Sequence, residues 1–380
     1  MYFRELESII RRQLEQPEVI MLYGARQTGK STLLEMLAQS LQQETPSRAV
    51  KILNCENPLV SDILSGMNPE KIRQLFDQCP VVAFDEAQVV PGIGRILKLI
   101  YDDKLHSTRL IATGSSSFEL SNSTGEPLTG RNIIFRLYPL SIGEIRKQHG
   151  WLRVLEKLDD LLIYGSYPGI VDLEPEHRRQ KLISLTGDYL FKDIFKFEKL
   201  RNPMLLRKLL KALALQVGSM VSNHELAQLA GVSPLTIERY LDLLEKSFVI
   251  FSIGSYGGNL RNELKKSRKY YFYDNGIRNA IINNFSQPSD RADMGALWEN
   301  FCIAEKLKLN EHNRKTANLY FWRTYDGAEI DLLESYDGHL DAYEFKWNAA
   351  KKANLPAAFA NKYTVGTFRV INPGNLHTLA

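Results

Sequence analysis

The clearest chemical pattern in the sequence is GARQTGKS at Gly24–Ser31. In this GxxxxGK[ST] spacing, glycines let the backbone curl so that N–H groups face a phosphate, and the following helix N-terminus adds its dipole. Lys30 would reach the β- and γ-phosphates of ATP, and the Ser31 hydroxyl would bind Mg²⁺. The residues expected to hold the nucleotide are Gly24, Ala25, Arg26, Gln27, Thr28, Gly29, Lys30, Ser31 and Thr32. A chance match is disfavoured because an apolar strand precedes the loop and a helix follows it.

Two adjacent carboxylates follow another apolar run, PVVAFDE. Asp85 is expected to hold magnesium through water, and Glu86 to orient and polarise the attacking water. A single acid at a strand end serves solubility, whereas two acids downstream of a phosphate loop are more specific. After the next apolar run, Ser115 or Thr113 is a candidate sensor of the γ-phosphate. Both are equally compatible with a polar loop start.

A second group of charged residues lies in the last hundred residues. Glu299 falls in the helical pattern ALWENFCIAEKL, Asp331 in the strand-like EIDLLE, and Glu344 with Lys346 in AYEFKW. Residues i and i+2 of a strand share a face, so Glu344 and Lys346 point the same way. Pairing of the two strands around a turn at 337–338 would bring Asp331 to them.

An acid on one strand and E-x-K on the next resemble the core of the PD-(D/E)xK nucleases. That resemblance implies metal ligands at Glu299, Asp331 and Glu344, and catalytic roles for Glu344 and Lys346. The carboxylates would hold magnesium, and the lysine would position the nucleophile. A cross-strand salt bridge accounts equally well for Glu344 and Lys346, but less well for Asp331 in an apolar strand. Both cleavage and binding without cleavage remain open.

The segment ELAQLAGVSPLTIERYLDLLEKSFVI predicts helix, turn, helix and strand. Gly231 marks the turn, Ser233 the N-cap and Pro234 the first helical position. With a following hairpin as the wing, this is a winged helix-turn-helix. The residues that would contact DNA are Thr236, Arg239, Arg261, Lys265, Lys266 and Arg268. Acidic neighbours on the second helix disfavour groove entry, so a protein-binding role stays open.

The elements that must position these residues follow from apolar patterning. Apolar runs at 18–23, 49–55, 80–86 and 109–117 alternate with helical patterns, which is typical of a parallel sheet with helices on both faces. In such α/β sheets function sits at the carboxyl ends of the strands. A helix at 295–310 and three strand-like segments follow near the C-terminus, after a polar stretch at 285–293 that is the best linker candidate.

Bulk composition sets the class of protein. The 380 residues are 44% hydrophobic and 24% charged, which is typical of a globular protein of several domains. The net charge of +4 does not by itself indicate nucleic acid, and no apolar run is long enough to span a bilayer. Cys55, Cys79 and Cys302 show no disulfide or zinc spacing, so we expect a cytoplasmic location and no membrane partner.

Most of the chain resembles the AAA-type ATPases of bacteria and archaea whose C-terminal half is a domain of unknown function. The stretches that carry the resemblance are GARQTGKS, FDEAQ, ATGSSS, LTGR, PLSIGEI and YGSYPGI. By position, Arg131 in LTGR matches the family's arginine, which implies a finger on a neighbouring subunit's γ-phosphate. A plain surface arginine is the other interpretation. The resemblance specifies the ATPase and says little about biological role.

We therefore predict an α/β chain with a parallel-sheet AAA-type ATPase core at 1–139 and a helical lid at 140–202. A winged helix-turn-helix at 203–284 and a restriction-endonuclease-like α/β domain at 293–380 would follow. The leading hypothesis is an ATPase whose nucleotide state controls a DNA-directed C-terminal module that is a candidate nuclease. The alternative is an ATP-dependent regulatory switch, forming a homo-oligomer or recruiting a protein partner, with a catalytically silent C-terminal domain.

Overall fold

The computed structural model describes residues 1–44, 49–76, 79–102, 108–115, 128–189, 202–257 and 268–379. Two compact units make up the chain: residues 1–138 with 246–248, and residues 139–245 with 249–380. The finer division of the second unit into three domains remains a prediction. Of the expected DNA-contacting residues, Arg261, Lys265 and Lys266 lie outside the described residues.

Five parallel strands form the sheet of the first unit, in the order β2-β3-β4-β1-β5. They are β1 (Val19–Tyr23), β2 (Val50–Asn54), β3 (Val81–Asp85), β4 (Arg109–Gly114) and β5 (Asn132–Arg136). Strands β1 and β3 are buried along their whole length, as near-continuous apolar runs require when helices cover both faces. The four strands predicted from the sequence are confirmed. Strand β5 was not predicted. It lies at the edge of the sheet, so most of its residues are partly or fully exposed and it lacks the continuous apolar run of β1 and β3.

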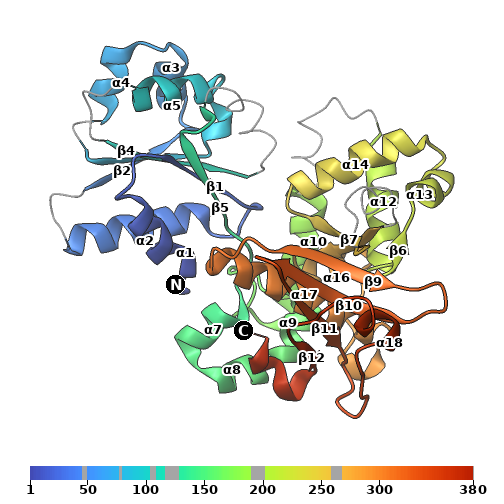
Figure 1. Cartoon of the computed structure of the whole chain (residues 1–380). Coiled ribbons are helices and arrows are strands. Elements are labelled where there is room, and N and C mark those ends of the chain that lie inside the picture. The colour runs from blue at the N-terminus through green and yellow to red at the C-terminus, as the bar shows by residue number, and fades with distance from the viewer. Residues whose placement is uncertain are drawn as a thin grey trace. The chain divides into compact units, whose positions relative to one another are not determined.

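Helices α1 and α2 cover one face of this sheet, and α3, α4 and α5 cover the other (Figure 1). They are α1 (Glu5–Gln13), α2 (Lys30–Glu44), α3 (Pro58–Ser65), α4 (Pro69–Phe76) and α5 (Ile93–Asp102). Helix α2 carries leucines at helical spacing that are buried in one core with Ile20 and Leu22 of β1. They are Leu33, Leu34, Leu37 and Leu41. This packing fixes the start of α2 at the carboxyl end of β1.

The second unit begins with helices. They are α7 (Ile142–His149), α8 (Trp151–Glu156), α9 (Leu158–Tyr164), α10 (Pro175–Ser184), α12 (Pro203–Leu215), α13 (Asn223–Ala230) and α14 (Pro234–Lys246), with α16 (Asn275–Ile281), α17 (Met294–His312) and α18 (Ala357–Ala360) later in the chain. The predicted helix, turn and helix are present as α13 and α14. Gly231 closes α13 in the left-handed conformation, and the Ser233 hydroxyl accepts the Thr236 N–H at 3.2 Å.

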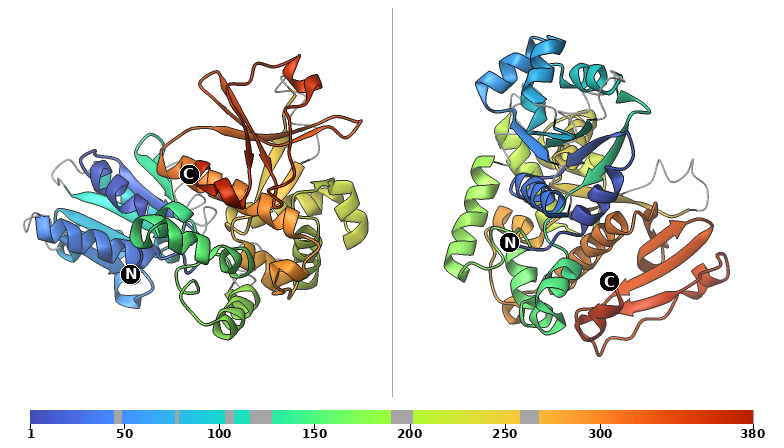
Figure 2. Two further views of the ribbon diagram at one scale, coloured as in Figure 1. Left: turned by 90° about the horizontal axis from the view of Figure 1, so that it is seen from below. Right: turned by 90° about the vertical axis from the view of Figure 1, so that its left-hand side faces the viewer.

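Seven strands form the sheet of the second unit, in the order β12-β11-β10-β9-β7-β8-β6. They are β6 (Met220–Val221), β7 (Ile250–Ser255), β8 (Arg268–Phe272), β9 (Asn318–Arg323), β10 (Glu329–Tyr336), β11 (His339–Phe345) and β12 (Phe368–Ile371). Strands β9, β10 and β11 confirm the three predicted C-terminal strands, which lie side by side in Figure 2. Strand β7 pairs with β9, so one sheet joins the expected wing to the C-terminal strands.

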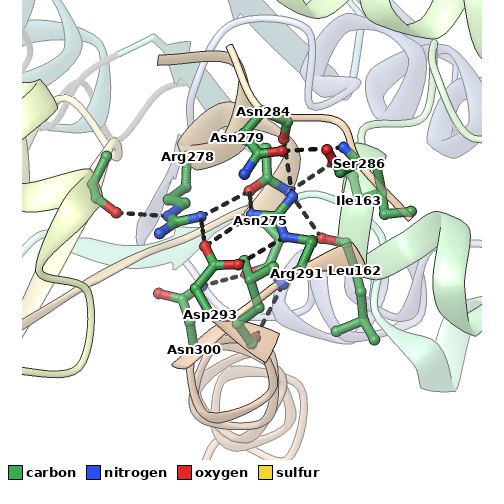
Figure 3. A network of polar contacts seen from close by, with 12 residues as sticks. Leu162, Ile163, Asn275, Arg278, Asn279, Asn284, Ser286, Arg291, Asp293 and Asn300 are labelled. Atoms are coloured by element: carbon green, nitrogen blue, oxygen red, sulfur yellow. Dashed lines mark hydrogen bonds and ion pairs between the residues drawn. The ribbon is translucent and has the colours of Figure 1, made fainter. Parts of the chain in front are cut away.

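The polar stretch at 285–293 is not a free linker. The Arg291 guanidinium bonds to Asp293, to the Asn284 carbonyl and to Asn279, and its side chain is fully buried (Figure 3). Asn279 in turn donates to the carbonyls of Leu162 and Ile163 in α9. The stretch is therefore tied to the helices of the second unit. None of the helices that the structure describes is long and apolar enough to cross a bilayer.

Candidate functional site

The loop between β1 and α2 has the shape that its glycines predict. Gly29 has φ +95°, and Gln27 also adopts a positive φ of 61°. A Cβ on Gly24 would lie 2.3 Å from the Leu137 carbonyl oxygen, so only glycine fits there. The Lys30 ammonium donates to the carbonyls of Gly24 (2.9 Å) and Ala25 (3.2 Å), and is almost fully buried. The loop is therefore closed around its own lysine.

Asp85 links the phosphate loop to the centre of the sheet. Its carboxylate accepts the Ser31 hydroxyl at 2.6 Å and the Thr113 hydroxyl at 2.6 Å. The structure thus brings together the two residues predicted to hold magnesium, one from α2 and one from β3. A hydroxyl and a carboxylate oxygen are ligands that suit Mg²⁺, together with water and phosphate oxygens. The residues present fit the ion that the motif implies.

Glu86 stands directly after β3 in a conformation that favours glycine, with φ 51° and ψ 46°. Its N–H donates to the Thr113 hydroxyl at 3.0 Å, and its carboxylate lies 3.9 Å from the Lys30 ammonium. Gln88 holds the same carboxylate through its amide nitrogen at 2.6 Å, and also donates to the Ser115 hydroxyl at 3.3 Å. The strained backbone and its side-chain bonds aim Glu86 at the loop.

Thr113 and Ser115 therefore differ in position. Thr113 is fully buried and uses its hydroxyl on Asp85 and on the Glu86 N–H, so it positions these two acids. Ser115 lies at the end of β4 and keeps the role of candidate γ-phosphate sensor. Gln88 is a residue to which sequence reasoning gave no role, although it stands within the quoted FDEAQ stretch.

Arg131 lies at the other end of the sheet from the phosphate loop. Its carbonyl accepts the Val19 N–H at 2.8 Å, at the start of β1, whereas the loop follows the end of β1. A five-residue strand places these ends about 13 Å apart. The guanidinium, about one-third exposed, pairs with Asp102 at 2.9 Å. A contact between Arg131 and a γ-phosphate would therefore need the nucleotide of another copy of the chain.

We expect Arg131→Ala to spare ATP binding and to reduce hydrolysis by about 10³-fold or more, as loss of an arginine finger does. Mixing this variant with Lys30→Ala, which has a defective loop but an intact Arg131, should restore activity. ATPase rates of each variant and of their mixture provide the measurement. Arg95→Ala, at an exposed position of α5, is the matched control. A mixture no more active than its components would contradict action between copies.

A second charged cluster lies where β8, α17 and the C-terminal strands meet. Lys269 of β8 is buried and pairs with Glu299 at 3.2 Å and with Glu329 at 2.5 Å. The Tyr271 hydroxyl donates to Glu299 at 2.6 Å. Burial lowers the pKa of Lys269, but the two carboxylates outweigh it and raise that pKa above its ordinary value. Glu299 therefore receives its counter-charge from the chain itself.

Asp331 and Glu344 lie on paired strands of this cluster. Asp331 lies where the pairing of β10 with β9 shifts register, between Ile330 and Leu333, and its carboxylate accepts the Phe345 N–H at 2.8 Å. Burial, and then the charges of Glu299 and Glu344, raise the pKa of Asp331 well above its usual range. Lys346 donates to Glu344 at 2.5 Å, as the shared strand face predicts.

The cluster only partly matches the predicted metal site. Within the described residues, no three His, Cys, Asp or Glu side chains are placed to hold one metal ion together. Mg²⁺ needs only one or two carboxylates when water completes its shell, so Asp331 and Glu344 stay the candidate ligands, although Glu344 already accepts from Lys346. Glu299 is already paired with Lys269. The set of three metal ligands therefore stays a prediction.

A five-stranded parallel sheet with a phosphate loop after β1 and an acidic pair at the end of β3 defines an AAA-type P-loop fold, which implies nucleotide binding. Residues 16–146 match the family model described as an AAA domain. Residues 155–288 and 294–377 match two models, each described as a domain of unknown function.

The chain is similar to an uncharacterized protein of Mycobacterium tuberculosis, with 25% identity over 348 residues, 90% of this chain and 73% of that protein. An uncharacterized protein of Haemophilus influenzae is 27% identical over 275 residues, 68% of each chain. Among solved structures, AMPPCP-bound DnaA from Aquifex aeolicus aligns with a TM-score of 0.35 and 16% identity, covering 63% of this chain and 86% of that one. That structural likeness is distant.

Proposed function

We propose that this chain is a magnesium-dependent ATPase whose nucleotide state controls its second unit. The observation that carries the proposal is the convergence of Ser31, Asp85 and Glu86 on the loop that holds Lys30. The fold supports nucleotide binding, and the acidic pair supports hydrolysis. Release of phosphate from ATP by the purified chain, lost in Lys30→Ala, is the test. A chain that binds ATP with Mg²⁺ but never hydrolyses it would contradict the enzymatic part.

Each residue has a distinct task in this ATPase. The N–H groups of the loop and Lys30 bind the phosphates and offset their charge as it shifts during cleavage. Ser31 and Asp85 would hold Mg²⁺, which neutralises the β- and γ-phosphate oxygens. Glu86, fixed by Thr113 and Gln88, orients and polarises the attacking water. Arg131 of a neighbouring copy would add positive charge opposite the loop.

For the second unit, the first candidate is a DNA-directed module. Helix α14 exposes Arg239, and Arg268 of β8 is exposed and donates to the Ser252 hydroxyl at 3.0 Å. Two positively charged side chains on a helix-turn-helix and its hairpin suit phosphate contacts. Asp331 and Glu344, with Lys346, would supply the metal-holding and nucleophile-positioning groups of a nuclease, in which a bound dication activates water.

We expect supercoiled DNA incubated with the chain, ATP and Mg²⁺ or Mn²⁺ to be cut. Cutting should be lost in Glu344→Ala, because this change leaves Asp331 alone of the two carboxylates proposed to hold the metal. Agarose gels of supercoiled and linear DNA provide the measurement. Asp326→Ala, an exposed acid in the β9–β10 turn, is the matched control, and Lys30→Ala tests dependence on ATP. Uncut DNA in every lane, with both metals, would contradict the nuclease.

The second candidate is a regulatory switch whose C-terminal domain does not cut. It is favoured by Lys269, whose ion pairs with Glu299 and Glu329 already supply positive charge to the acidic cluster. Light scattering with a slowly hydrolysed ATP analogue, beside DNA titrations at several salt concentrations, separates the two candidates. Nucleotide-driven assembly without salt-dependent DNA affinity supports the switch.

A further inference from the structure

Arg4, just before α1, is a buried cation that no role above accounts for. Its side chain reaches into the first unit and donates through Nη1 to the Thr28 carbonyl at 2.7 Å. Through Nη2 it donates to the Tyr138 carbonyl, also at 2.7 Å. Only 4% of the residue is exposed. A buried guanidinium is retained only where it is well hydrogen-bonded, so these two carbonyls fix its place.

The two carbonyls belong to segments with different tasks. Thr28 lies inside the phosphate loop, directly before Gly29 and Lys30. Tyr138 is the last residue of the first unit before the chain enters the second unit at Pro139. Arg4 therefore joins the phosphate loop to the first of the segments through which the chain passes between the two units.

The other end of the loop rests on the same connecting segment. The Leu137 N–H donates to the Tyr23 carbonyl at 2.7 Å, just before the loop begins. Gly24 packs so closely on the Leu137 carbonyl that a Cβ would meet it at 2.3 Å. Leu137 thus contacts the start of the loop directly. Tyr138 is linked to Thr28, near the end of the loop, through the Arg4 side chain.

A bound nucleotide would change the hydrogen bonds of this loop. The Lys30 ammonium donates to the carbonyls of Gly24 and Ala25, and a bound polyphosphate would compete for the same ammonium. Those carbonyls then lose a charged donor while the N–H groups of the loop gain phosphate acceptors. Because Gly24 packs on Leu137, and Thr28 is tied through Arg4 to Tyr138, such an adjustment would reach residues 137–138.

We propose that Arg4 is a positioning residue that fixes the phosphate loop against residues 137–138 and passes the nucleotide state to the connection into the second unit. This coupling rests on the proposed function, in which ATP controls that unit. Arg4 makes no contact with the nucleotide in this role. Its effect on ATP arises from the shape of the loop, and its effect on the second unit from the covalent connection.

Arg4→Ala is expected to raise the KM for ATP roughly 10- to 100-fold, as expected for loss of hydrogen bonds from a charged donor. The kcat at saturating ATP should change much less, because Lys30, Asp85 and Glu86 remain. Hydrogen–deuterium exchange of residues 139–189 should respond to a slowly hydrolysed ATP analogue in the wild type. In Arg4→Ala that response should be absent even at a saturating concentration of the analogue.

Arg12→Ala, an exposed arginine on α1, is the matched control and should behave as the wild type in both measurements. Arg4→Lys keeps the charge but lacks the planar fork that serves two carbonyls, and it should give an intermediate KM and exchange response. It also keeps the test decisive should Arg4→Ala fail to fold. The proposal would be overturned if both Arg4 variants retained the wild-type exchange response. It would also be overturned if their KM for ATP equalled that of Arg12→Ala.

The coupling can fail without the failure of the proposed function. Wild-type hydrolysis together with a nucleotide response that both Arg4 variants retain would leave the ATPase in place and remove the role of Arg4. A wild-type chain that shows neither hydrolysis nor any exchange response to nucleotide would instead overturn the proposed function itself.

Discussion

Glu86→Gln should leave ATP bound and slow its hydrolysis by about 10²- to 10⁴-fold, the range expected when a positioned proton-accepting group is removed. Glutamine keeps the size of the side chain and can still accept the hydrogen bond from Gln88. It cannot polarise the attacking water as a carboxylate does. Lys30 and Asp85 are unchanged, so the contacts proposed for the phosphates and magnesium would be kept.

The variant thus separates binding from hydrolysis. Fluorescent ATP titration gives the affinity, and phosphate release gives the rate under single-turnover conditions. Glu70→Gln, an exposed acid in α4, is the matched control and should retain both properties. Asp85→Asn should differ from Glu86→Gln, because Asp85 accepts the Ser31 hydroxyl and its loss should weaken the dependence of binding on magnesium. Wild-type hydrolysis in Glu86→Gln would assign water activation to another residue.

The candidate ATP site was largely predictable because its motifs are local and their context is strict. A strand, a glycine loop and a helix follow one another in sequence, and the acids of β3 arrive at the same edge because all five strands are parallel. The role of Thr113 was not predictable. Its hydroxyl, on β4, donates to Asp85 and accepts the Glu86 N–H at the end of the neighbouring strand β3. No spacing in the sequence predicts this contact between strands.

The C-terminal cluster was less predictable, because its contacts join residues that are distant in the sequence. Strand alternation predicted that Glu344 and Lys346 share a face, and the 2.5 Å contact between them confirms it. The partner of Glu299 could not be predicted, because Lys269 comes from β8, thirty residues earlier in the chain. That strand reaches the cluster through the seven-stranded sheet, in which β7 pairs with β9, and through α17, whose Asn300 bonds to the Phe272 backbone of β8. Long-range strand order has no local signature.

Asp293→Ala should lower the free energy of unfolding of the second unit by about 2–3 kcal/mol. Asp293 accepts hydrogen bonds from Arg278 at 2.6 Å and from Arg291 at 2.8 and 2.9 Å (Figure 3). Both arginine side chains are almost completely buried, so the variant leaves two guanidinium groups without their carboxylate. Removal of one partner from a fully buried pair costs about 3–5 kcal/mol, and the partial exposure of Asp293 reduces that loss.

The effect of Asp293 should depend on pH in a defined direction. Burial alone would raise the pKa of Asp293, but the hydrogen bonds from Arg291 and the charge of Arg278 lower it from 3.8 to about 2. A carboxyl whose pKa is lower in the folded state stabilises the fold above its unfolded pKa. The difference in stability between wild type and Asp293→Ala should therefore be complete above about pH 4 and shrink as the pH falls toward 2.

Chemical denaturation of the wild type and of Asp293→Ala, followed across this pH range, measures both effects. Asp290→Ala removes an exposed acid three residues earlier and should cost little, because its carboxylate accepts only from the neighbouring Ser289 hydroxyl among the described residues. Asp293→Asn keeps the side-chain volume and one acceptor oxygen, so its loss of unfolding free energy should lie between those of Asp293→Ala and Asp290→Ala. Equal free energies of unfolding for Asp293→Ala and Asp290→Ala at neutral pH would show that the Asp293 carboxylate does not hold the two buried arginines. The segment 285–293 would then depend on its other contacts, among them the hydrogen bonds of Arg291 to Asn279 and to the Asn284 carbonyl.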